Sequence, residues 1–276
     1  MKRYPTALSI AGSDSCGGAG IQADLKTFSA WGVYGMTVIT AVTAQNTMSV
    51  RAVQAVDPKV LEEQLDAVFS DFTIDAVKTG MLNDRETVRL VIEAVDKYQP
   101  EWVVVDPVMV ATSGSVLLKE DAMELVVNEL LPRATLVTPN IPEAECILGR
   151  DIDKSNGEEM AMRLVEEKHL NAVLLKGGHW DGEDSDDLFY VRNGKQPSFF
   201  RKKKIETSNT HGTGCTLSAA ITAGLALGLD LHEAIAHAEE YIGRAIAAGA
   251  DVQAGHGHGP VNHLFDPRKL HKITCG

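Results

Sequence analysis

The sequence predicts an α/β fold: a single three-layer domain in which helices cover both faces of a mostly parallel sheet. Short apolar segments, several of them rich in Val and Ile, alternate along the chain with segments that carry helix-start signals. Short buried strands joined by helices are typical of such sheets. The 276 residues could form two small domains, but α/β chains of this length often form one. We expect one domain over residues 1–265 and a C-terminal tail over 266–276.

The expected strands and helices follow one another at short intervals. The strands are predicted at 7–11, 37–43, 74–78, 102–106, 135–138 and 172–176. Asp57, followed by proline, indicates a helix start, and Ser155 with Glu158 and Asp230 with Glu233 both fit a capping box. The last two helices of the core are predicted at 212–228 and 230–249.

The pattern changes after the Lys176-Gly177-Gly178 turn. Segments 187–192 and 197–205 lie on either side of Asn193-Gly194, which is a strong signal for a β-hairpin. The second segment contains Arg201-Lys202-Lys203-Lys204, which we interpret as a solvated strand edge that resists pairing with other chains.

Charge and cysteine content narrow the classes of function. The formal net charge is −12, with 38 acidic against 26 basic residues, so the chain lacks the basic excess of nucleic-acid-binding proteins. Cys16, Cys146, Cys215 and Cys275 are scattered and show no disulfide or zinc spacing. The longest uncharged stretch, 213–229, is short for a membrane span. We expect a cytoplasmic protein without nucleic-acid or membrane partners, whose anionic substrate needs a local positive site.

Residues 209–216, Asn-Thr-His-Gly-Thr-Gly-Cys-Thr, open an almost uncharged helix. Helix starts attract anions because their N–H groups are unpaired and carry partial positive charge. Gly212 and Gly214 would let a phosphate approach the backbone closely. Cys215 would lie in the first turn, where the same field favours the thiolate. The alternative is a tight turn into a buried helix, with Cys215 as a small core residue.

Two further segments are rich in glycine. Residues 11–20 follow the first strand, at the edge where open α/β sheets bind their ligands. This loop lacks the Gly-Lys-Ser/Thr of a P-loop and the dinucleotide-binding spacing, so a flexible loop without a ligand is the alternative. His256 and His258 lie in the other segment, which we interpret as a loop near the site rather than as a metal site.

Seven motifs occur together along this chain. In order, they are Ile10 to Thr27, Ala44-Gln45-Asn46, Lys78-Thr79-Gly80-Met81-Leu82, Val105-Asp106-Pro107-Val108-Met109, Thr138-Pro139-Asn140-Ile141-Pro142-Glu143-Ala144, Lys176-Gly177-Gly178-His179 and Thr210 to Cys215. With them, nearly the whole chain resembles the hydroxymethylpyrimidine/phosphohydroxymethylpyrimidine kinase family of the ribokinase-like superfamily. The resemblance implies a homodimeric, ATP- and Mg²⁺-dependent kinase of thiamin biosynthesis. Its substrates would be 4-amino-5-hydroxymethyl-2-methylpyrimidine and then the monophosphate of that compound.

The resemblance also implies roles for individual residues. The anion hole for the transferred phosphate, with the cysteine as base or alcohol-orienting group, would be Gly212, Thr213, Gly214 and Cys215. The acceptor would contact Gly12, Ala19, Asp24, Gln45, Met81 and Val108. The nucleotide would contact Asn140, Lys176 and Thr210, with a weaker similar role for Lys78. Magnesium would be held by Glu143, with Asp106 as a possible helper.

Side-chain chemistry agrees with the acceptor positions. The Gln45 carboxamide offers one kind of donor and one acceptor, which match the edge of an aminopyrimidine. Asp24 would accept from the exocyclic amine, although a surface acid in the first helix is the alternative. Met81 and Val108 are equally consistent with ordinary core residues.

Side-chain chemistry also agrees with the nucleotide and metal positions. Carboxylates are ligands that Mg²⁺ prefers, often through water. An acidic protein needs a local cation such as Lys176 for a phosphate. The alternatives are that Glu143 stabilises a helix N-terminus and that Lys176 extends from a strand end into water.

Two rival functions remain open at this stage. A pyridoxal-type kinase shares the superfamily and phosphorylates a comparable hydroxymethyl heterocycle, but Gln45-Asn46 and Cys215 favour the pyrimidine enzyme. A non-catalytic sensor would usually lose the anion-hole glycines or the acidic magnesium residue. Gly212, Gly214 and Glu143 are all present, which favours an enzyme.

Overall fold

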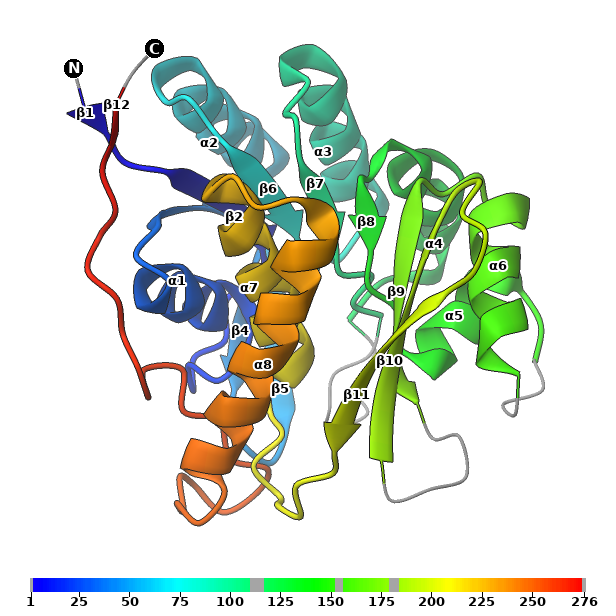
Figure 1. The fold of residues 1–276 in the computed structure, drawn as a ribbon. Coiled ribbons are helices and arrows are strands. Elements are labelled where there is room, and N and C mark those ends of the chain that lie inside the picture. Colours follow the sequence, from blue (N-terminus) through cyan, green and yellow to red (C-terminus); the bar gives the residue numbers. More distant parts are fainter. Residues whose placement is uncertain (1, 110–116, 152–155, 179–183, 275–276) are drawn as a thin grey trace.

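The computed structural model describes residues 2–109, 117–151, 156–178 and 184–274 (Figure 1). Within these ranges the main sheet has eight strands, paired in parallel from β3 to β9 and antiparallel at β10 and β11. In spatial order they are β11 (Ser198–Lys203), β10 (Asp184–Val191), β9 (Ala172–Gly178), β8 (Leu136–Val137), β7 (Val103–Val105), β6 (Ala76–Thr79), β2 (Thr6–Ala11) and β3 (Tyr34–Ile39). The mostly parallel sheet and the hairpin after the Lys176-Gly177-Gly178 turn are therefore confirmed.

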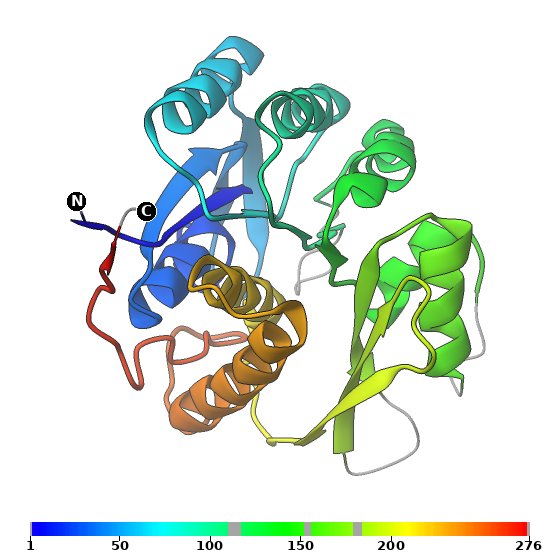
Figure 2. The same cartoon turned by 45° about the horizontal axis from the view of Figure 1, so that its top comes forward.

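Helices cover both faces of this sheet, as Figures 1 and 2 show. One face carries α1 (Gly20–Ala30), α7 (Thr213–Ala226) and α8 (Leu231–Gly249). The other carries α2 (Pro58–Asp71), α3 (Arg85–Tyr98), α4 (Glu120–Leu125), short π and 3-10 segments (Val126–Leu130, Leu131–Arg133), α5 (Ile141–Leu148) and α6 (Gly157–Glu167). Neighbouring strand residues enter opposite cores: Ala7 and Ala76 pack toward α7, and Leu8 and Val77 toward α3. Within the described ranges, no helix has the length and apolar character of a membrane span.

Side chains close in the sequence cap the N-termini of several helices. The Asp57 side chain caps α2, and Asp230 with Glu233 forms the predicted capping box of α8. Ser155 lies outside the described residues, and the side chain that caps α6 is that of Asn156.

The predicted strand 37–43 is in fact two strands. Between them the Thr40 N–H donates to the Ala11 carbonyl over 3.0 Å and its hydroxyl donates to the Met81 carbonyl over 2.7 Å. After this break, β4 (Ala41–Gln45) leaves the main sheet and pairs antiparallel with β5 (Val50–Ala55). We did not predict β5, because its largely exposed residues lack an alternating apolar pattern. The break places Gln45 beyond the carboxyl edge of the sheet.

The C-terminal segment runs back along α1, so the two termini lie close together (Figure 1). Its strand β12 (Ile273–Thr274) pairs with β1 (Lys2–Arg3). On the way, the Arg268 N–H donates to the Ala30 carbonyl and the His271 N–H to the Gly32 carbonyl, each over 2.8 Å. Residues 266–274 are thus attached to the domain by backbone hydrogen bonds, although they are largely exposed.

Candidate active site

A cavity of about 530 Å³ opens at the carboxyl edge of the parallel strands. Every residue predicted for the site except Asp24 and Lys78 lines it: Gly12, Ala19, Gln45, Met81, Asp106, Val108, Asn140, Glu143, Lys176, Thr210, Gly212, Thr213, Gly214 and Cys215. Most of these motifs meet here because they lie at the carboxyl ends of parallel strands of the main sheet. Gln45 comes instead from β4, and residues 210–215 from the segment that leads into the first turn of α7.

The start of α7 forms the anion-binding part of the cavity. Gly212 adopts a left-handed conformation with φ of 82°, and a Cβ there would lie 1.8 Å from the Gly18 carbonyl oxygen, so only glycine fits. No side chain among the described residues caps this helix start. A Cβ on Gly214 would lie 3.2 Å from the Lys176 ammonium, so this cation faces the first turn of α7. Backbone N–H groups and a lysine together favour a phosphate.

Three charged side chains from different elements meet beside the helix start. Lys176 Nζ lies 2.8 Å from Asp106 Oδ1 and 4.0 Å from Glu143 Oε2. Burial raises the pKa of Glu143 to about 6; Lys176 opposes this shift and Asp106 adds to it. Burial works against the lysine charge, but Asp106 and Glu143 together raise the pKa of Lys176. Lys176 therefore forms a buried ion pair and does not extend into water.

Glu143 and Asn140 also form the capping box of α5. The Asn140 N–H donates to Glu143 Oε2 over 2.8 Å, and the Glu143 N–H donates to Asn140 Oδ1 over 2.9 Å. The helix-start role considered for Glu143 is thus present, and it coexists with a place in the cavity wall.

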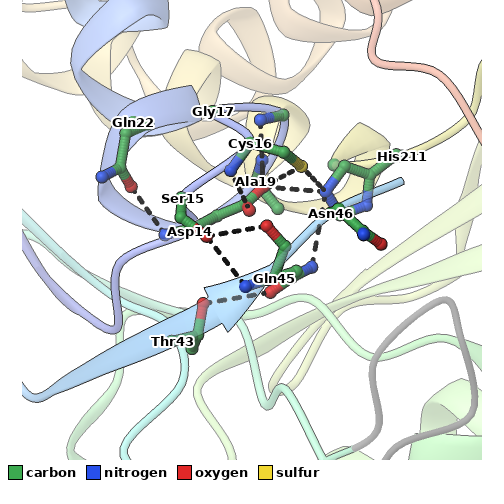
Figure 3. A network of polar contacts seen from close by, with 12 residues as sticks. Asp14, Ser15, Cys16, Gly17, Ala19, Gln22, Thr43, Gln45, Asn46 and His211 are labelled. Atoms are coloured by element: carbon green, nitrogen blue, oxygen red, sulfur yellow. Dashed lines mark hydrogen bonds and ion pairs between the residues drawn. The ribbon is translucent and has the colours of Figure 1, made fainter. Parts of the chain in front are cut away.

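Gln45 lies on the acceptor side of the cavity, within a polar network (Figure 3). The Ser15 hydroxyl donates to the Gln45 carbonyl over 2.7 Å and accepts from the Gln45 N–H over 2.8 Å. The Gln45 carboxamide lies 3.4 Å from the Thr43 hydroxyl and 3.5 Å from His211 Nε2. Its backbone is held firmly, while its side chain makes only long contacts.

Comparison with known proteins identifies the family. Residues 14–262 match the family model of phosphomethylpyrimidine kinase. The chain belongs to this family. A hydroxymethylpyrimidine/phosphomethylpyrimidine kinase of Rhizobium meliloti is 51% identical over 262 residues, which cover 94% of this chain and 96% of that protein. The chain is therefore a phosphotransferase, and the sensor alternative is set aside.

Solved structures show the same fold in two kinds of vitamin kinase. The phosphomethylpyrimidine kinase of Clostridium difficile 630 is 46% identical with a TM-score of 0.76, covering 87% of this chain and 99% of that one. The Staphylococcus aureus pyridoxal kinase in complex with AMP-PCP and pyridoxal is 34% identical with a TM-score of 0.84, covering 95% and 94%. The ribokinase-like fold predicted for this kinase is thereby confirmed.

The expected lowering of the Cys215 pKa is wrong for the free kinase. Burial raises the pKa of this thiol to about 11. Lys78 opposes the shift, whereas the charges of Asp106 and Asp24 add to it. Burial and two nearby carboxylates thus outweigh the effect of Lys78 on the thiol.

Two residues predicted at ligands lie beneath the cavity instead. Asp24 and Lys78 are fully buried and form an ion pair of 2.6 Å, and the Ser9 hydroxyl donates to Asp24 over 2.6 Å. Neither residue lines the cavity. Although burial opposes it, the Asp24 carboxylate raises the pKa of Lys78 and keeps it charged. A buried charge needs a partner of opposite sign, and Asp24 and Lys78 supply it to each other.

The basic segment of the hairpin is also more than a solvated edge. Lys202, Lys203 and Lys204 line the cavity. Lys202 Nζ lies 2.8 Å from Asp187 Oδ2 and 2.5 Å from Glu239 Oε2. The prediction failed because both acids are distant in the sequence from the lysine that they hold.

Sequence reasoning missed Asp14 and His211, although both lie in the motifs that it singled out. Asp14 Oδ2 lies 2.8 Å from His211 Nε2, and both residues are buried in the cavity wall. With Cys16, they bring three possible metal-ligand atoms within 4.8 Å of one another, but hydrogen bonds already use the Asp14 carboxylate. The available signal was an aspartate among glycines and a histidine directly before Gly-Thr-Gly.

Proposed function

We propose that this kinase transfers the γ-phosphate of ATP to the hydroxymethyl group of 4-amino-5-hydroxymethyl-2-methylpyrimidine and then phosphorylates the resulting monophosphate. The observation that carries the proposal is one cavity that joins Gln45 to the start of α7 and Lys176. A donor-and-acceptor side chain suits the aminopyrimidine, and helix N–H groups with a lysine suit the phosphate. The 51% identity to the Rhizobium meliloti kinase supports the choice of substrate.

ATP fits a second part of the cavity wall. Four apolar side chains from α7, α8 and the segment after β11 line this part: Ile205, Leu217, Ile242 and Ile246. Such a surface suits a heterocyclic base, and the lysines beside it suit a polyphosphate. The Staphylococcus aureus pyridoxal kinase, which shares the fold, is in complex with the ATP analogue AMP-PCP.

Mg²⁺ fits the acidic residues of the site. Glu143 and Asp106 offer carboxylate oxygens, which Mg²⁺ prefers as ligands. Burial and the charge of Asp106 raise the pKa of Glu143 to about 6, although Lys176 opposes this shift. A bound dication would stabilise the ionised form of both carboxylates. When bound with the nucleotide, the ion would neutralise charge on the phosphates. We assign Glu143 to this role, with Asp106 as its helper.

Cys215 orients the acceptor hydroxyl in this proposal. With its pKa raised to about 11, the thiol is neutral near pH 7, so it is not a ready base. Phosphoryl transfer has a loose transition state, in which the hydroxyl loses its proton late and positioning dominates. Lys176 and the N–H groups of α7 hold the phosphoryl group while the acceptor oxygen attacks it.

Pyridoxal is a second candidate acceptor, favoured by the TM-score of 0.84 to the Staphylococcus aureus pyridoxal kinase. A coupled assay of ADP release with the pyrimidine, its monophosphate and pyridoxal tests both candidates. We expect the highest kcat/KM with the two pyrimidines. A higher value with pyridoxal, or no turnover of the pyrimidine alcohol, contradicts the proposal.

We also propose that the kinase is a cytoplasmic homodimer. The β4–β5 hairpin exposes Val42, Met48 and Val53, which are 54%, 63% and 39% accessible, and such a surface supports self-association. Light scattering at micromolar concentration should give twice the mass of one chain, and a stable monomer would contradict the proposal.

A further inference from the structure

The segment Gly255-His256-Gly257-His258-Gly259, which we call the glycine spacer, lies between two parts of the active site. On one side is the turn of the β4–β5 hairpin, which directly follows Gln45. On the other side is segment 208–211, which leads into the anion hole. Beyond Thr40 the hairpin is no longer part of the main sheet, so other contacts hold it in place. Ser15 holds its first strand at Gln45, and the glycine spacer holds its turn.

Two backbone groups of the spacer bind the hairpin turn at Thr47. The Gly257 N–H donates to the Thr47 hydroxyl over 3.1 Å, and the His258 N–H donates to the Thr47 carbonyl over 3.0 Å. The turn is braced internally, because the Asn46 side chain accepts from two N–H groups within it over 2.9 and 3.0 Å. A movement of Thr47 is therefore transmitted to Gln45 and is not absorbed by the turn.

The other end of the spacer is fixed to the segment before the anion hole. The Gly259 carbonyl accepts from the His211 N–H over 3.0 Å. A Cβ on Gly259 would lie 2.1 Å from Asn209 Oδ1. The Asn209 side chain cannot easily give way, because its amide donates to the carbonyls of Gly249 and Val252 over 2.7 and 2.6 Å. The spacer thus contacts this segment as closely as it contacts the hairpin.

The glycines allow the spacer to lie directly against Thr47. A Cβ on Gly257 would lie 2.2 Å from the Thr47 carbonyl oxygen, so backbone meets backbone at this point. A Cβ on Gly255, whose φ is 84°, would lie 2.5 Å from the Thr47 hydroxyl oxygen. From Gly257 to Gly259 the chain advances by two residues, which span about 7 Å at most. The hairpin turn and the segment before the anion hole are therefore joined by a short backbone connection.

We propose that the glycine spacer is a positioning element for phosphoryl transfer: it sets the separation between the acceptor bound at Gln45 and the phosphate bound at Gly212. None of its residues lines the cavity, so it acts through the two segments that it joins. Transfer requires the reacting atoms to lie about 3–3.5 Å apart, and a misplacement of about 1 Å can cost on the order of 10²-fold in rate. The inference rests on the function proposed above.

The first test is Gly257→Ala. To reach ordinary contact distance, either the spacer or the turn must move by about 1 Å, and either movement disturbs the hydrogen bonds at Thr47. We expect kcat to fall roughly 10²-fold while the KM values for ATP and acceptor change less than about threefold, because each binding surface stays intact. Steady-state kinetics and the melting temperature are measured together.

Gly194→Ala is the matched control. Its Cβ would lie 2.8 Å from the Val191 carbonyl oxygen, which is the same kind of backbone conflict in the β10–β11 turn, outside the cavity. This variant should lose stability and keep kcat within about twofold of the wild type. If Gly257→Ala lowers kcat no more than Gly194→Ala does, or raises the KM of the acceptor at unchanged kcat, the inference is overturned.

A second comparison uses Gly255→Ala, and it remains available if Gly257→Ala does not fold. The Gly255 Cβ would meet side-chain atoms of Thr47, Oγ1 at 2.5 Å and Cγ2 at 2.7 Å, and Thr47→Ala removes both. In the Thr47→Ala background, Gly255→Ala should therefore lower kcat less than it does in the wild type, whereas Gly257→Ala, which faces the backbone oxygen, should lower it as much. Equal effects of Gly255→Ala in both backgrounds contradict the inference.

All rates are measured with the acceptor that the unmodified kinase turns over fastest. Failure of the unmodified kinase to use the aminopyrimidine overturns the proposed function, whereas the comparison of spacer variants can still be made with pyridoxal. The two proposals therefore fail separately.

Discussion

Cys215 and Glu143 share one property at the scale of single residues: burial raises the pKa of both. The values are about 11 for the thiol and about 6 for the carboxyl group. The two groups lie in the same wall as Lys176, whose charge offsets part of the effect on Glu143. The free cavity therefore disfavours additional negative charge, and both groups respond to pH in measurable ways.

For Cys215 we expect slow alkylation at pH 7 that accelerates as the pH rises toward about 11, because the thiolate is the nucleophile. The measurement is mass spectrometry after iodoacetamide treatment, in a chain whose Cys16, Cys146 and Cys275 are replaced by serine. Cys215→Ala should lower kcat by roughly 10²-fold at unchanged melting temperature, which is the cost expected when the acceptor hydroxyl loses its orientation. Rapid alkylation at neutral pH, or wild-type turnover of the alanine variant, contradicts these roles.

The position of Cys215 could be predicted from the local sequence, but the direction of its pKa shift could not. The glycine pattern places Cys215 correctly at a helix start beside a phosphate site. The direction of its pKa shift depends first on burial and then on Asp106 and Asp24, which come from a strand end and another helix. No local pattern contains those neighbours, so the sequence-based expectation had the wrong sign.

For Glu143→Gln we expect stability and activity to change in opposite directions. The pKa is raised from 4.5 to about 6 in the folded state, so the native protein binds this proton more tightly. That contribution to stability is complete below pH 4.5 and is lost as the pH rises through about 6. The amide does not titrate and can still accept the capping hydrogen bond. Relative to wild type, the variant should therefore gain about 1–2 kcal/mol in free energy of unfolding between pH 4.5 and 7.5.

Kinetics complete the test of Glu143. In the same variant the activation free energy of phosphoryl transfer at saturating Mg²⁺ should rise by several kcal/mol, the order of magnitude expected when the metal charge is misplaced. Denaturant unfolding at both pH values and kcat measurements check the two halves. A near-normal kcat would leave Glu143 with its capping role alone. If the free energy of unfolding of the variant and of the wild-type protein changed equally with pH, the raised pKa would be contradicted.

At the scale of elements, the β10–β11 hairpin contacts α8 through a lysine and through Phe189 and Phe200, whose rings lie against His232. Lys202 lies between Asp187 of β10 and Glu239 of α8. Asp187 also accepts from the Gly177 N–H over 2.9 Å, next to Lys176. The hairpin was predictable from Asn193-Gly194, but its attachment to α8 was not, because partners far apart in sequence decide it.

Lys202→Met should weaken the attachment of this hairpin to α8. It leaves two buried acids facing each other without their cation, which should cost about 3 kcal/mol of unfolding free energy. It should also raise the KM for ATP, because the Gly177 turn loses its support. The matched control is Arg201→Met on the same strand, whose side chain is 78% exposed and should cost less than about 0.5 kcal/mol. Urea unfolding followed by circular dichroism compares them, and equal losses would contradict the role of Lys202.

At the scale of the whole molecule, the sequence predicts the three layers and the edge of the sheet that carries the site. It does not predict the full course of the backbone. Apolar segments separated by helical segments predict a parallel sheet. Motifs that follow the predicted strands indicate one shared site. The break at Thr40 and the return of the C-terminal segment to β1 depend on hydrogen bonds between distant backbone groups. Such contacts leave no periodic pattern in the sequence.

Removing residues 266–276 tests our proposed division into a catalytic unit and a tail. The deletion loses the backbone hydrogen bonds of Arg268 and His271, the β1–β12 pairing and the Arg268 cation at 5.4 Å from the Trp31 ring. We expect a loss of about 2 kcal/mol in unfolding free energy, with kcat and KM within about twofold of the full chain. Calorimetry and steady-state kinetics check this. A loss of activity at unchanged stability would place the segment in the catalytic unit.

The carboxylate of Asp14 also gives the first glycine-rich loop its own built-in counter-ion. Backbone N–H groups that would otherwise form a cradle for phosphate already surround an internal anion. The molecule therefore contains two glycine-rich turns that differ in what their N–H groups bind. In the first turn they bind the Asp14 carboxylate, whereas the second turn, at Gly212, lies open to the cavity. Of the two turns, only the one at Gly212 therefore keeps backbone N–H groups that a phosphate could use.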